Sequence, residues 1–331
     1  MSTITGRSMR MRQTGHWQNE LPDAARSRAE AAGHAGRRWM RELDETVRAL
    51  ADGWNLSIGD ALPGGSESLV LAVRQQDGTD AVLKIRMPGN DDFEGEARTY
   101  ELSRGRGLAT LYAASDDHRA LLMERLGPCI ADLGWSVSEQ IDAICRTLKE
   151  LWHAPVDGDS IPTGAWKATW LSEFIDHSWQ RLGQPCARRT RDRALDFAAE
   201  RADAHLSATT VLVHADAHEH NLLLVRGQDC KPGTPCKFVD PDGLLAEPAC
   251  DLAVPMRGFS TELRDAPVRR GRGRCAYLAE LCAVDERAIW QWGFMERVST
   301  GLHLLELGIE EEAREMLEVA DHWSRHSGPR G

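Results

Sequence analysis

Residues 211–224 read VLVHADAHEHNLLL, a cluster of polar side chains between two apolar runs. Residues 237–243 read KFVDPDG, another apolar run that ends in carboxylates. Each apolar run predicts a buried strand. The polar side chains at the strand ends would be costly to bury without a partner, and a metal ion would remove that cost. The stretch therefore predicts both a small β-rich island and a functional site.

The spacing inside the first run fits phosphoryl transfer. That reaction needs a group that orients the attacking hydroxyl, oxygen ligands for Mg²⁺ and a cation on the nucleotide phosphates. The pattern Asp216-x-x-x-x-Asn221 matches the kinase catalytic loop, in which the Asp faces the hydroxyl and the Asn binds a metal ion. Asp240 follows the next predicted strand, where kinases place the metal-binding Asp of the Asp-Phe-Gly motif.

The third requirement is met earlier in the chain. Two β-rich runs, 69–73 and 81–85, flank an Asp-Gly turn and predict a hairpin. Lys84 lies in the second run, Ala-Val-Leu-Lys-Ile, which matches the kinase strand whose lysine meets the phosphates. A helix is expected from Phe93 to about Arg104, and Glu96 on it is the expected ion-pair partner of Lys84, with Glu94 as the alternative.

The other predicted elements place the strands first and the helices second, which indicates an α+β chain divided near residue 126. A helix over 21–51 and a glycine bend at 62–68 precede the hairpin, and a buried strand at 120–126 follows it. Beyond that point helices are expected at 137–153, 166–182, 187–206, 275–298 and 302–323, around the β-rich island at 211–239.

The run His214-x-Asp216-x-His218-x-x-Asn221 resembles the His-Gly-Asp-Leu-His-x-x-Asn signature of the aminoglycoside phosphotransferases. Ala215 and Ala217 depart from that signature. Residues 239–244 (VDPDGL) and 247–253 (EPACDLA) are similar to Ile-Asp-Pro-Lys-Gly-Leu and Glu-Pro-Ala-Tyr-Asp-Leu-Ala in the streptomycin 6-kinase-like group, which also includes hydroxyurea phosphotransferases. The resemblance covers roughly residues 30–325. No segment resembles the Ala-Pro-Glu of protein kinases, which favours a small-molecule acceptor.

The resemblance implies a two-lobed protein-kinase-like fold. Residues 1–20 are polar and are expected to form a flexible tail. After this tail, the resemblance implies a nucleotide-binding N-lobe with a small antiparallel sheet (21–125) and a mostly helical C-lobe (126–331). It also implies ATP and Mg²⁺ as cofactors. The implied site consists of Asp216 as catalytic base, Asn221 and Asp240 as metal ligands, Lys84, Glu96, Gly65, Ser66, Met123, Glu124 and Leu126 around the nucleotide, and His214 and Asp251 as structural supports.

Composition narrows the possible partners. The net charge of −11 over 331 residues argues against nucleic acid, whose phosphates need clustered Lys and Arg. No apolar run approaches the ~18 residues of a membrane span. The absence of an apolar secretory region and of Cys-x-x-Cys pairs among eight cysteines suggests a reducing cytoplasm. The acidic surface either simply solvates the protein or suits a cationic acceptor.

Several interpretations stay open at this point. The preferred acceptor is a streptomycin-type aminoglycoside, with hydroxyurea, a peptide antibiotic or an endogenous metabolite as alternatives. A metal hydrolase or oxygenase is a rival because an extended segment would put His214, Asp216, His218 and His220 on one face. That interpretation gives Lys84, Asn221 and Asp240 no role. A non-catalytic nucleotide-binding protein is a second rival, and the sequence does not indicate the oligomeric state.

Overall fold

The computed structural model of the chain describes residues 16–65, 67–89, 93–156, 161–206, 208–326 and 328. The chain divides into two compact units. The first runs to Ala97 and resumes over Ala109–Leu126, and the second comprises Arg98–Leu108 and Gly127 onward. Ser66 and most of the expected tail lie outside the described residues. Trp17, also assigned to that tail, lies in the short 3-10 helix η1 (Trp17–Asn19) and is buried, because its indole joins the core of the first unit.

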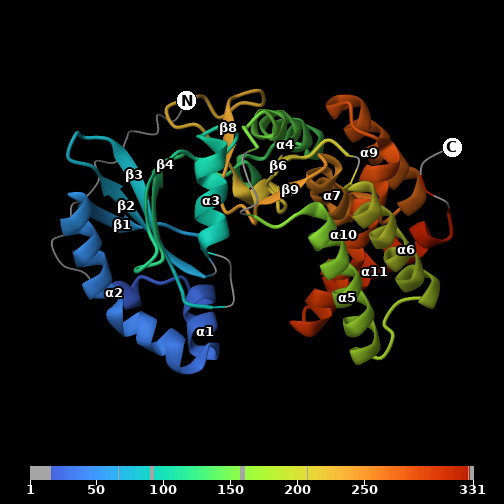
Figure 1. The fold of residues 1–331 in the computed structure, drawn as a ribbon, viewed down its shortest axis with the longest axis horizontal. Helices are drawn as coiled ribbons and strands as arrows, with labels where there is room; N and C mark the ends of the chain where they lie inside the picture. The colour runs from blue at the N-terminus through green and yellow to red at the C-terminus, as the bar shows by residue number, and fades with distance from the viewer. Residues whose placement is uncertain are drawn as a thin grey trace. The chain divides into compact units, whose positions relative to one another are not determined.

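The first unit is built on a five-stranded antiparallel sheet (Figure 1). Its strands lie in the order β1-β2-β3-β5-β4. Their bounds are β1 (Ser57–Ala61), β2 (Ser68–Arg74), β3 (Asp80–Arg86), β4 (Leu111–Ser115) and β5 (Ala120–Glu124). The predicted hairpin is confirmed, since β2 and β3 pair in continuous register with Leu71 opposite Leu83. The strands β1 and β4 were not predicted.

Two helices cover one face of this sheet. In α2 (Gly33–Trp54) the apolar side chains recur every three or four residues and face Leu69, Leu71 and Val73 on β2. The prediction of one helix over 21–51 is wrong. Gly33 has a φ of +67°, which separates α1 (Asp23–Ala31) from α2, because a left-handed residue interrupts a right-handed helix.

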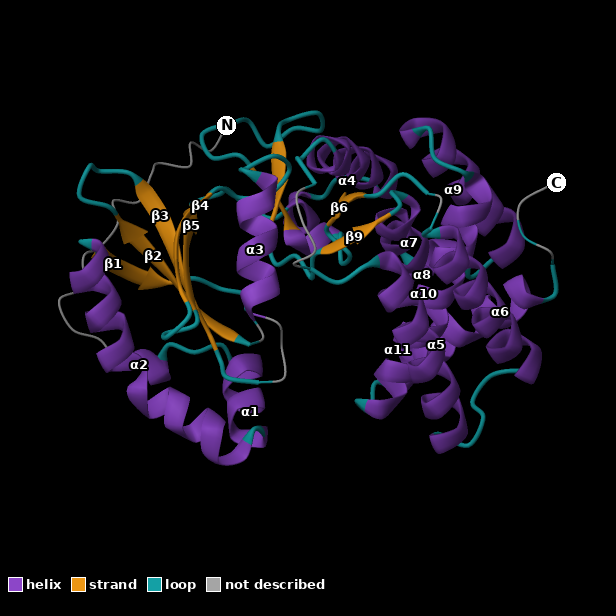
Figure 2. Ribbon diagram, viewed as in Figure 1, coloured by secondary structure: helices purple, strands orange, loops and turns teal. Residues whose placement is uncertain are grey.

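The second unit is mostly helical and contains two small antiparallel sheets (Figure 2). Strand β6 (Val211–Val213) pairs with β9 (Leu244–Ala246), and β7 (Leu222–Leu224) pairs with β8 (Cys236–Phe238). The helices are α4 (Val137–Trp152), α5 (Gly164–Arg181), α6 (Arg188–Ala204), α7 (Ala249–Arg257), α8 (Ser260–Leu263), α9 (Pro267–Cys282), α10 (Glu286–Glu306) and α11 (Glu310–Ser324), with the short 3-10 helices η2 (Ile130–Leu133) and η3 (Glu219–Asn221). The helix α3 (Phe93–Ser103) begins in the first unit and ends in this one.

Helix boundaries near the C-terminus differ from the prediction. The prediction of one helix over 275–298 is wrong. Ala283 adopts a left-handed conformation and ends α9. Asp285 then caps the start of α10 by accepting a hydrogen bond from the Ala288 amide. The expected helix at 302–323 is likewise divided, since Gly308 (φ +77°) separates α10 from α11. Helices α7 and α8 were not predicted.

Helix α10 forms the centre of the second unit. Its buried residues, among them Trp290, Trp292 and Phe294, lie on all sides of the helix, and it packs against α5, α6, α7, α9 and α11. A helix that is apolar all round belongs in a core. Two charged residues within it, Glu296 and Arg297, are also buried. Among the described residues, no helix is both long and apolar enough to cross a bilayer.

The crossing of α10 with α7 needs a glycine. A Cβ at Gly293 would lie 2.5 Å from the Cβ of Met256, so Gly293→Ala should force the two helices apart and lower the unfolding free energy by about 1–3 kcal/mol. Gly273→Ala on α9 is the control, because that position faces open space and alanine should stabilise the helix by up to about 1 kcal/mol. Urea denaturation measures the unfolding free energy of both variants. Equal changes in the two variants would contradict the close contact between α10 and α7 at Gly293.

Candidate active site

A buried carboxylate holds the loop that follows β6. Asp251, in the first turn of α7, is fully buried and accepts hydrogen bonds from the amides of Ala215 (2.8 Å) and His214 (3.2 Å). It also accepts one from the indole of Trp152 (2.8 Å). Burial raises the pKa of Asp251, while these donors favour its ionised form. The loop needs such support because Ala215 has a φ of +70°, a conformation that costs energy for a residue with a side chain.

His214 links this loop to the next one. Its Nδ1 accepts a hydrogen bond from the Asp216 amide (3.2 Å), so the ring proton lies on Nε2 and is donated to the Val239 carbonyl (3.0 Å). Burial lowers the pKa of His214, which keeps the ring neutral. The His214 ring also packs against the ring of Phe238, with the two planes tilted by 56°. Because both ring nitrogens are engaged, His214 cannot be a ligand of the metal cluster that the hydrolase alternative requires.

The Asp216 carboxylate is held by two donors. Its Oδ1 lies 2.6 Å from Nη2 of Arg257 and its Oδ2 lies 3.3 Å from Nε2 of His218. The side chain remains 32% exposed, so one side is open to a ligand. Burial acts to raise the pKa of Asp216, but the hydrogen bond from His218 and the charge of Arg257 outweigh it and hold the pKa well below its usual range. Asn221 donates its side-chain amide to the Asp216 carbonyl (3.1 Å).

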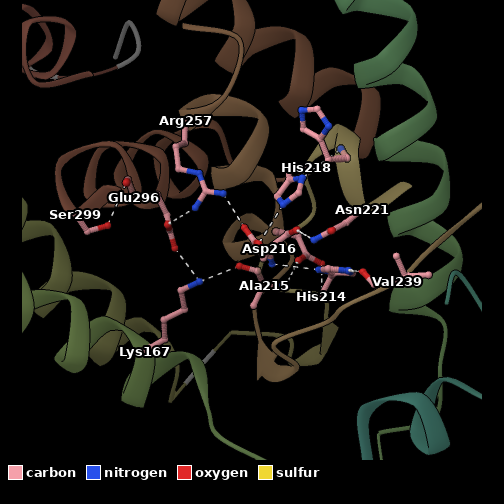
Figure 3. A network of polar contacts seen from close by, with 12 residues as sticks. Lys167, His214, Ala215, Asp216, His218, Asn221, Val239, Arg257, Glu296 and Ser299 are labelled. Carbon is pink, nitrogen blue, oxygen red and sulfur yellow. Dashed lines mark hydrogen bonds and ion pairs between the residues drawn. The ribbon is translucent and has the colours of Figure 1, made fainter. Parts of the chain in front are cut away.

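Behind Asp216 lies a chain of alternating charges, shown in Figure 3. Arg257 also forms an ion pair with Glu296, with its Nη1 3.2 Å from Oε2. The other oxygen of Glu296, Oε1, forms an ion pair with Lys167 and lies 2.7 Å from its Nζ. Lys167 in turn donates a hydrogen bond to the Ala215 carbonyl (3.0 Å). The series of contacts therefore begins and ends on the same loop. We call Asp216, Arg257, Glu296 and Lys167 the charge chain. Its members come from the loop, α7, α10 and α5.

Three members of the charge chain were not predicted from the sequence: Lys167, Arg257 and Glu296. A signal for two of them was present. Lys167 and Glu296 stand among apolar residues on helices, and such charged residues are almost never buried without a partner. No spacing rule connects residues 167, 257 and 296, because they lie on three separate helices.

The two predicted metal ligands lie at the same end of the β7–β8 hairpin. The Asn221 carbonyl accepts a hydrogen bond from the Val239 amide (2.9 Å), which places Asn221 beside the residue that precedes Asp240. Asp240 has a φ of +57° and donates its amide to the Tyr100 hydroxyl (2.9 Å). Within the part of the chain that the structure describes, no group of three or more His, Cys, Asp or Glu side chains could hold a metal ion.

In the first unit Lys84 and Glu96 form a buried ion pair. Nζ of Lys84 lies 2.7 Å from Oε1 of Glu96, and the two side chains are 8% and 2% exposed. Oε2 of Glu96 is bonded to Arg86. The partner is therefore Glu96, as the sequence predicted, and not the alternative Glu94.

The remaining predicted nucleotide residues also lie in the first unit. Met123 on β5 and Leu126 just after it are buried. The carboxylate of Glu124 accepts hydrogen bonds from the amide and hydroxyl of Thr110. Gly65 has a φ of +81°, which a residue with a side chain rarely adopts. Ser66 lies outside the described residues.

Loss of the Glu296 carboxylate should lower the unfolding free energy of the protein. Replacing Glu296 with Gln leaves Arg257 and Lys167 charged and buried without their shared carboxylate, which should cost about 3–5 kcal/mol of unfolding free energy at pH 7. Burial acts to raise the pKa of Glu296, but Lys167 and Arg257 lower it overall. The advantage of the wild type should therefore persist above pH ~4.3 and shrink as the pH falls through the folded-state pKa.

Urea denaturation from pH 7 to pH 3.5 measures this difference. The control is Glu310→Gln, which breaks an exposed i,i+4 pair with Arg314 and should cost less than about 1 kcal/mol. A Glu296 variant as stable as that control would show that the carboxylate does not neutralise the two cations.

The chain is similar in sequence to known phosphotransferases. A model of the family described as aminoglycoside/hydroxyurea antibiotic resistance kinase matches residues 53–308. The chain is 27% identical to the streptomycin 6-kinase of Streptomyces glaucescens over 87% of this chain and 92% of that protein. It is 27% identical to the hydroxyurea phosphotransferase of Kitasatospora aureofaciens over 66% of this chain and 62% of that protein.

Solved structures show the same fold. The GDP complex of aminoglycoside 2'-phosphotransferase-IIIa aligns with a TM-score of 0.54 at 16% identity, over 86% of this chain and 98% of that one. This likeness confirms the predicted protein-kinase-like α+β fold. The protein is thus a phosphotransferase that uses a nucleoside triphosphate and acts on a hydroxyl group of a small molecule. It belongs to the aminoglycoside/hydroxyurea antibiotic resistance kinase family.

Proposed function

We propose that this protein transfers the γ-phosphoryl group of ATP to a hydroxyl of a streptomycin-type aminoglycoside and thereby inactivates the antibiotic. The observation that carries the proposal is the ionised Asp216 carboxylate, held between Arg257 and His218 with one side open. A carboxylate fixed in this way can orient an acceptor hydroxyl. The choice of acceptor is supported by the likeness to a streptomycin 6-kinase over most of both chains.

Asp216 is the proposed catalytic base. Because its pKa is held well below the usual range, it does not remove the hydroxyl proton before transfer begins. Its role is to accept a hydrogen bond from the hydroxyl and to take the proton as the phosphorus–oxygen bond forms. Arg257 and His218 hold the two carboxylate oxygens, so the direction of that hydrogen bond is set before the acceptor arrives.

Asn221 and Asp240 are the proposed Mg²⁺ ligands. An amide oxygen and a carboxylate are hard oxygen donors, and the Asn221 amide nitrogen already faces the Asp216 carbonyl, which leaves its oxygen for a cation. Two protein ligands suit Mg²⁺, because this ion is usually bound by one or two carboxylates together with substrate phosphates and waters. When bound, the ion neutralises charge on the transferring phosphates.

The first unit is proposed to bind the nucleotide, as the N-lobe over 21–125, with the acceptor site in the C-lobe over 126–331. Glu96 binds Lys84 with one oxygen and Arg86 with the other, which fixes the direction of the lysine for contact with phosphates. Gly65 and Ser66 would lie against the phosphates, and Met123, Glu124 and Leu126 beside the adenine.

The second candidate acceptor is hydroxyurea, which is supported by the likeness to a hydroxyurea phosphotransferase. A panel assay separates the two. The purified protein with Mg·ATP should release ADP and add one phosphoryl group, detected by mass spectrometry, to streptomycin. It should modify hydroxyurea and a 2-deoxystreptamine aminoglycoside much more slowly. Phosphorylation of hydroxyurea alone would replace the streptomycin proposal with the second candidate.

The role of Asp216 is tested by Asp216→Asn. The amide cannot accept the hydroxyl proton, so turnover should fall by on the order of 10³-fold, while the dissociation constant for Mg·ATP stays near that of the wild type. Asp229→Asn, at an exposed Asp paired with Lys231 in the same unit, is the control and should keep full activity. Turnover of the Asp216 variant within tenfold of the wild type would rule out the assignment.

A further inference from the structure

Two exposed tryptophans on α5 stand apart from the other tryptophans. Of the eleven in the chain, Trp166 and Trp170 are 53% and 46% exposed, whereas the others are buried or partly buried. The two lie one helical turn apart on the same helix face. Large aromatic side chains are costly to expose in pairs, and an exposed apolar face of this kind marks a binding surface more often than a single exposed residue does.

Trp170 is held by a stacking contact within the same helix. Trp170 lies parallel to Phe174, with ring centroids 5.4 Å apart and an interplanar angle of 10°. Phe174 makes an edge-to-face contact with His303 on α10, with ring centroids 6.3 Å apart. We call Trp166, Trp170 and Phe174 the aromatic platform. The stacking holds the exposed Trp170 ring in a fixed orientation, as a preformed binding surface requires.

The aromatic platform begins beside the proposed catalytic loop. Helices α5 and α10 lie side by side and run parallel, because Lys167 pairs with Glu296, Phe174 with His303 and Ser178 with Glu306 in ascending order (Figure 1). Lys167 immediately follows Trp166, and its ammonium group contacts the Ala215 carbonyl, next to Asp216. With a rise of about 1.5 Å per residue, Trp170 and Phe174 lie roughly 5 and 10 Å further along the helix axis.

The charges on this face favour a cation. Helix α5 carries one Lys and one Arg: Lys167 is buried in the charge chain, and Arg181, in the last turn, forms an ion pair with Glu306 on α10. Glu173 is exposed and lies three residues after Trp170, so its carboxylate is on the same side of the helix. Indole rings attract cations over their faces, and a planar guanidinium group also stacks on them. A surface of three rings and a carboxylate, beside which Arg181 and His303 both lie close to the Glu306 carboxylate, is complementary to such a group.

We propose that the aromatic platform is an acceptor subsite that binds a planar cationic group, specifically a guanidinium of the acceptor, while a hydroxyl of the same molecule reaches Asp216. This inference rests on the proposed function, because it names the group by which the acceptor is held. It also explains why one helix carries both the lysine that supports the loop and the exposed rings. The acceptor is positioned relative to Asp216 by a single rigid element.

The test compares ring removal with ring replacement. Trp170→Ala should raise the KM for streptomycin about tenfold with little change in the KM for ATP, and Trp170→Phe should restore most of the affinity because a π face remains. Glu173→Gln should weaken streptomycin binding by a smaller factor. Tyr277→Ala, which removes another exposed aromatic ring on α9, is the control and should leave both KM values unchanged. Circular dichroism establishes that each variant is folded.

A second measurement does not depend on turnover. Methylguanidinium and its uncharged analogue methylurea are titrated into the protein while tryptophan emission is recorded. Methylguanidinium should change the emission of the wild type more than methylurea does, and Trp170→Ala should abolish the difference. If streptomycin is not phosphorylated but this difference is seen, the proposed acceptor is wrong and the subsite stands. Equal effects of both compounds, or an unchanged streptomycin KM in Trp170→Ala, would overturn the subsite.

Discussion

The second unit depends on the carboxylate of Glu296, which neutralises two buried cations at once. Without it, Lys167 would carry an uncompensated charge in the core and Arg257 would keep Asp216 as its one carboxylate partner, and an uncompensated buried charge costs several kcal/mol. With it, Arg257 can hold the Asp216 carboxylate and Lys167 can hold the carbonyl of the preceding residue. One carboxylate on the central helix therefore fixes both the backbone and the side chain of the proposed catalytic loop.

A second buried carboxylate, Asp251, holds the same loop from the other direction. It binds two backbone amides, whereas Lys167 binds a backbone carbonyl, so donors and acceptors of the loop are satisfied by different helices. This division of contacts explains how Ala215 can keep a left-handed conformation in place of a glycine. The loop is rigid because its polar groups are paired, and Asp216 keeps an exposed side because its own partners lie behind it.

Much of the fold and of the proposed site followed from local patterns. The hairpin that carries Lys84, the helix that carries Glu96 and the strands around Asp216 were all predicted, because alternation, turn residues and helical spacing act within a few residues. The predicted helices near the C-terminus were divided wrongly, since the breaks at Ala283 and Gly308 depend on left-handed backbone conformations that apolar periodicity does not reveal. Nor does such periodicity reveal that Trp166 and Trp170 are exposed.

The sequence by itself determined the family, the protein-kinase-like fold and the pairing of Lys84 with Glu96, because those properties reside in short motifs whose spacing reflects local structure. Tertiary structure decided which charges surround Asp216 and which aromatic rings stay in contact with water. Those facts depend on helices separated by tens of residues, and their side chains meet only when packing around α10 brings α5 and α7 to the same loop.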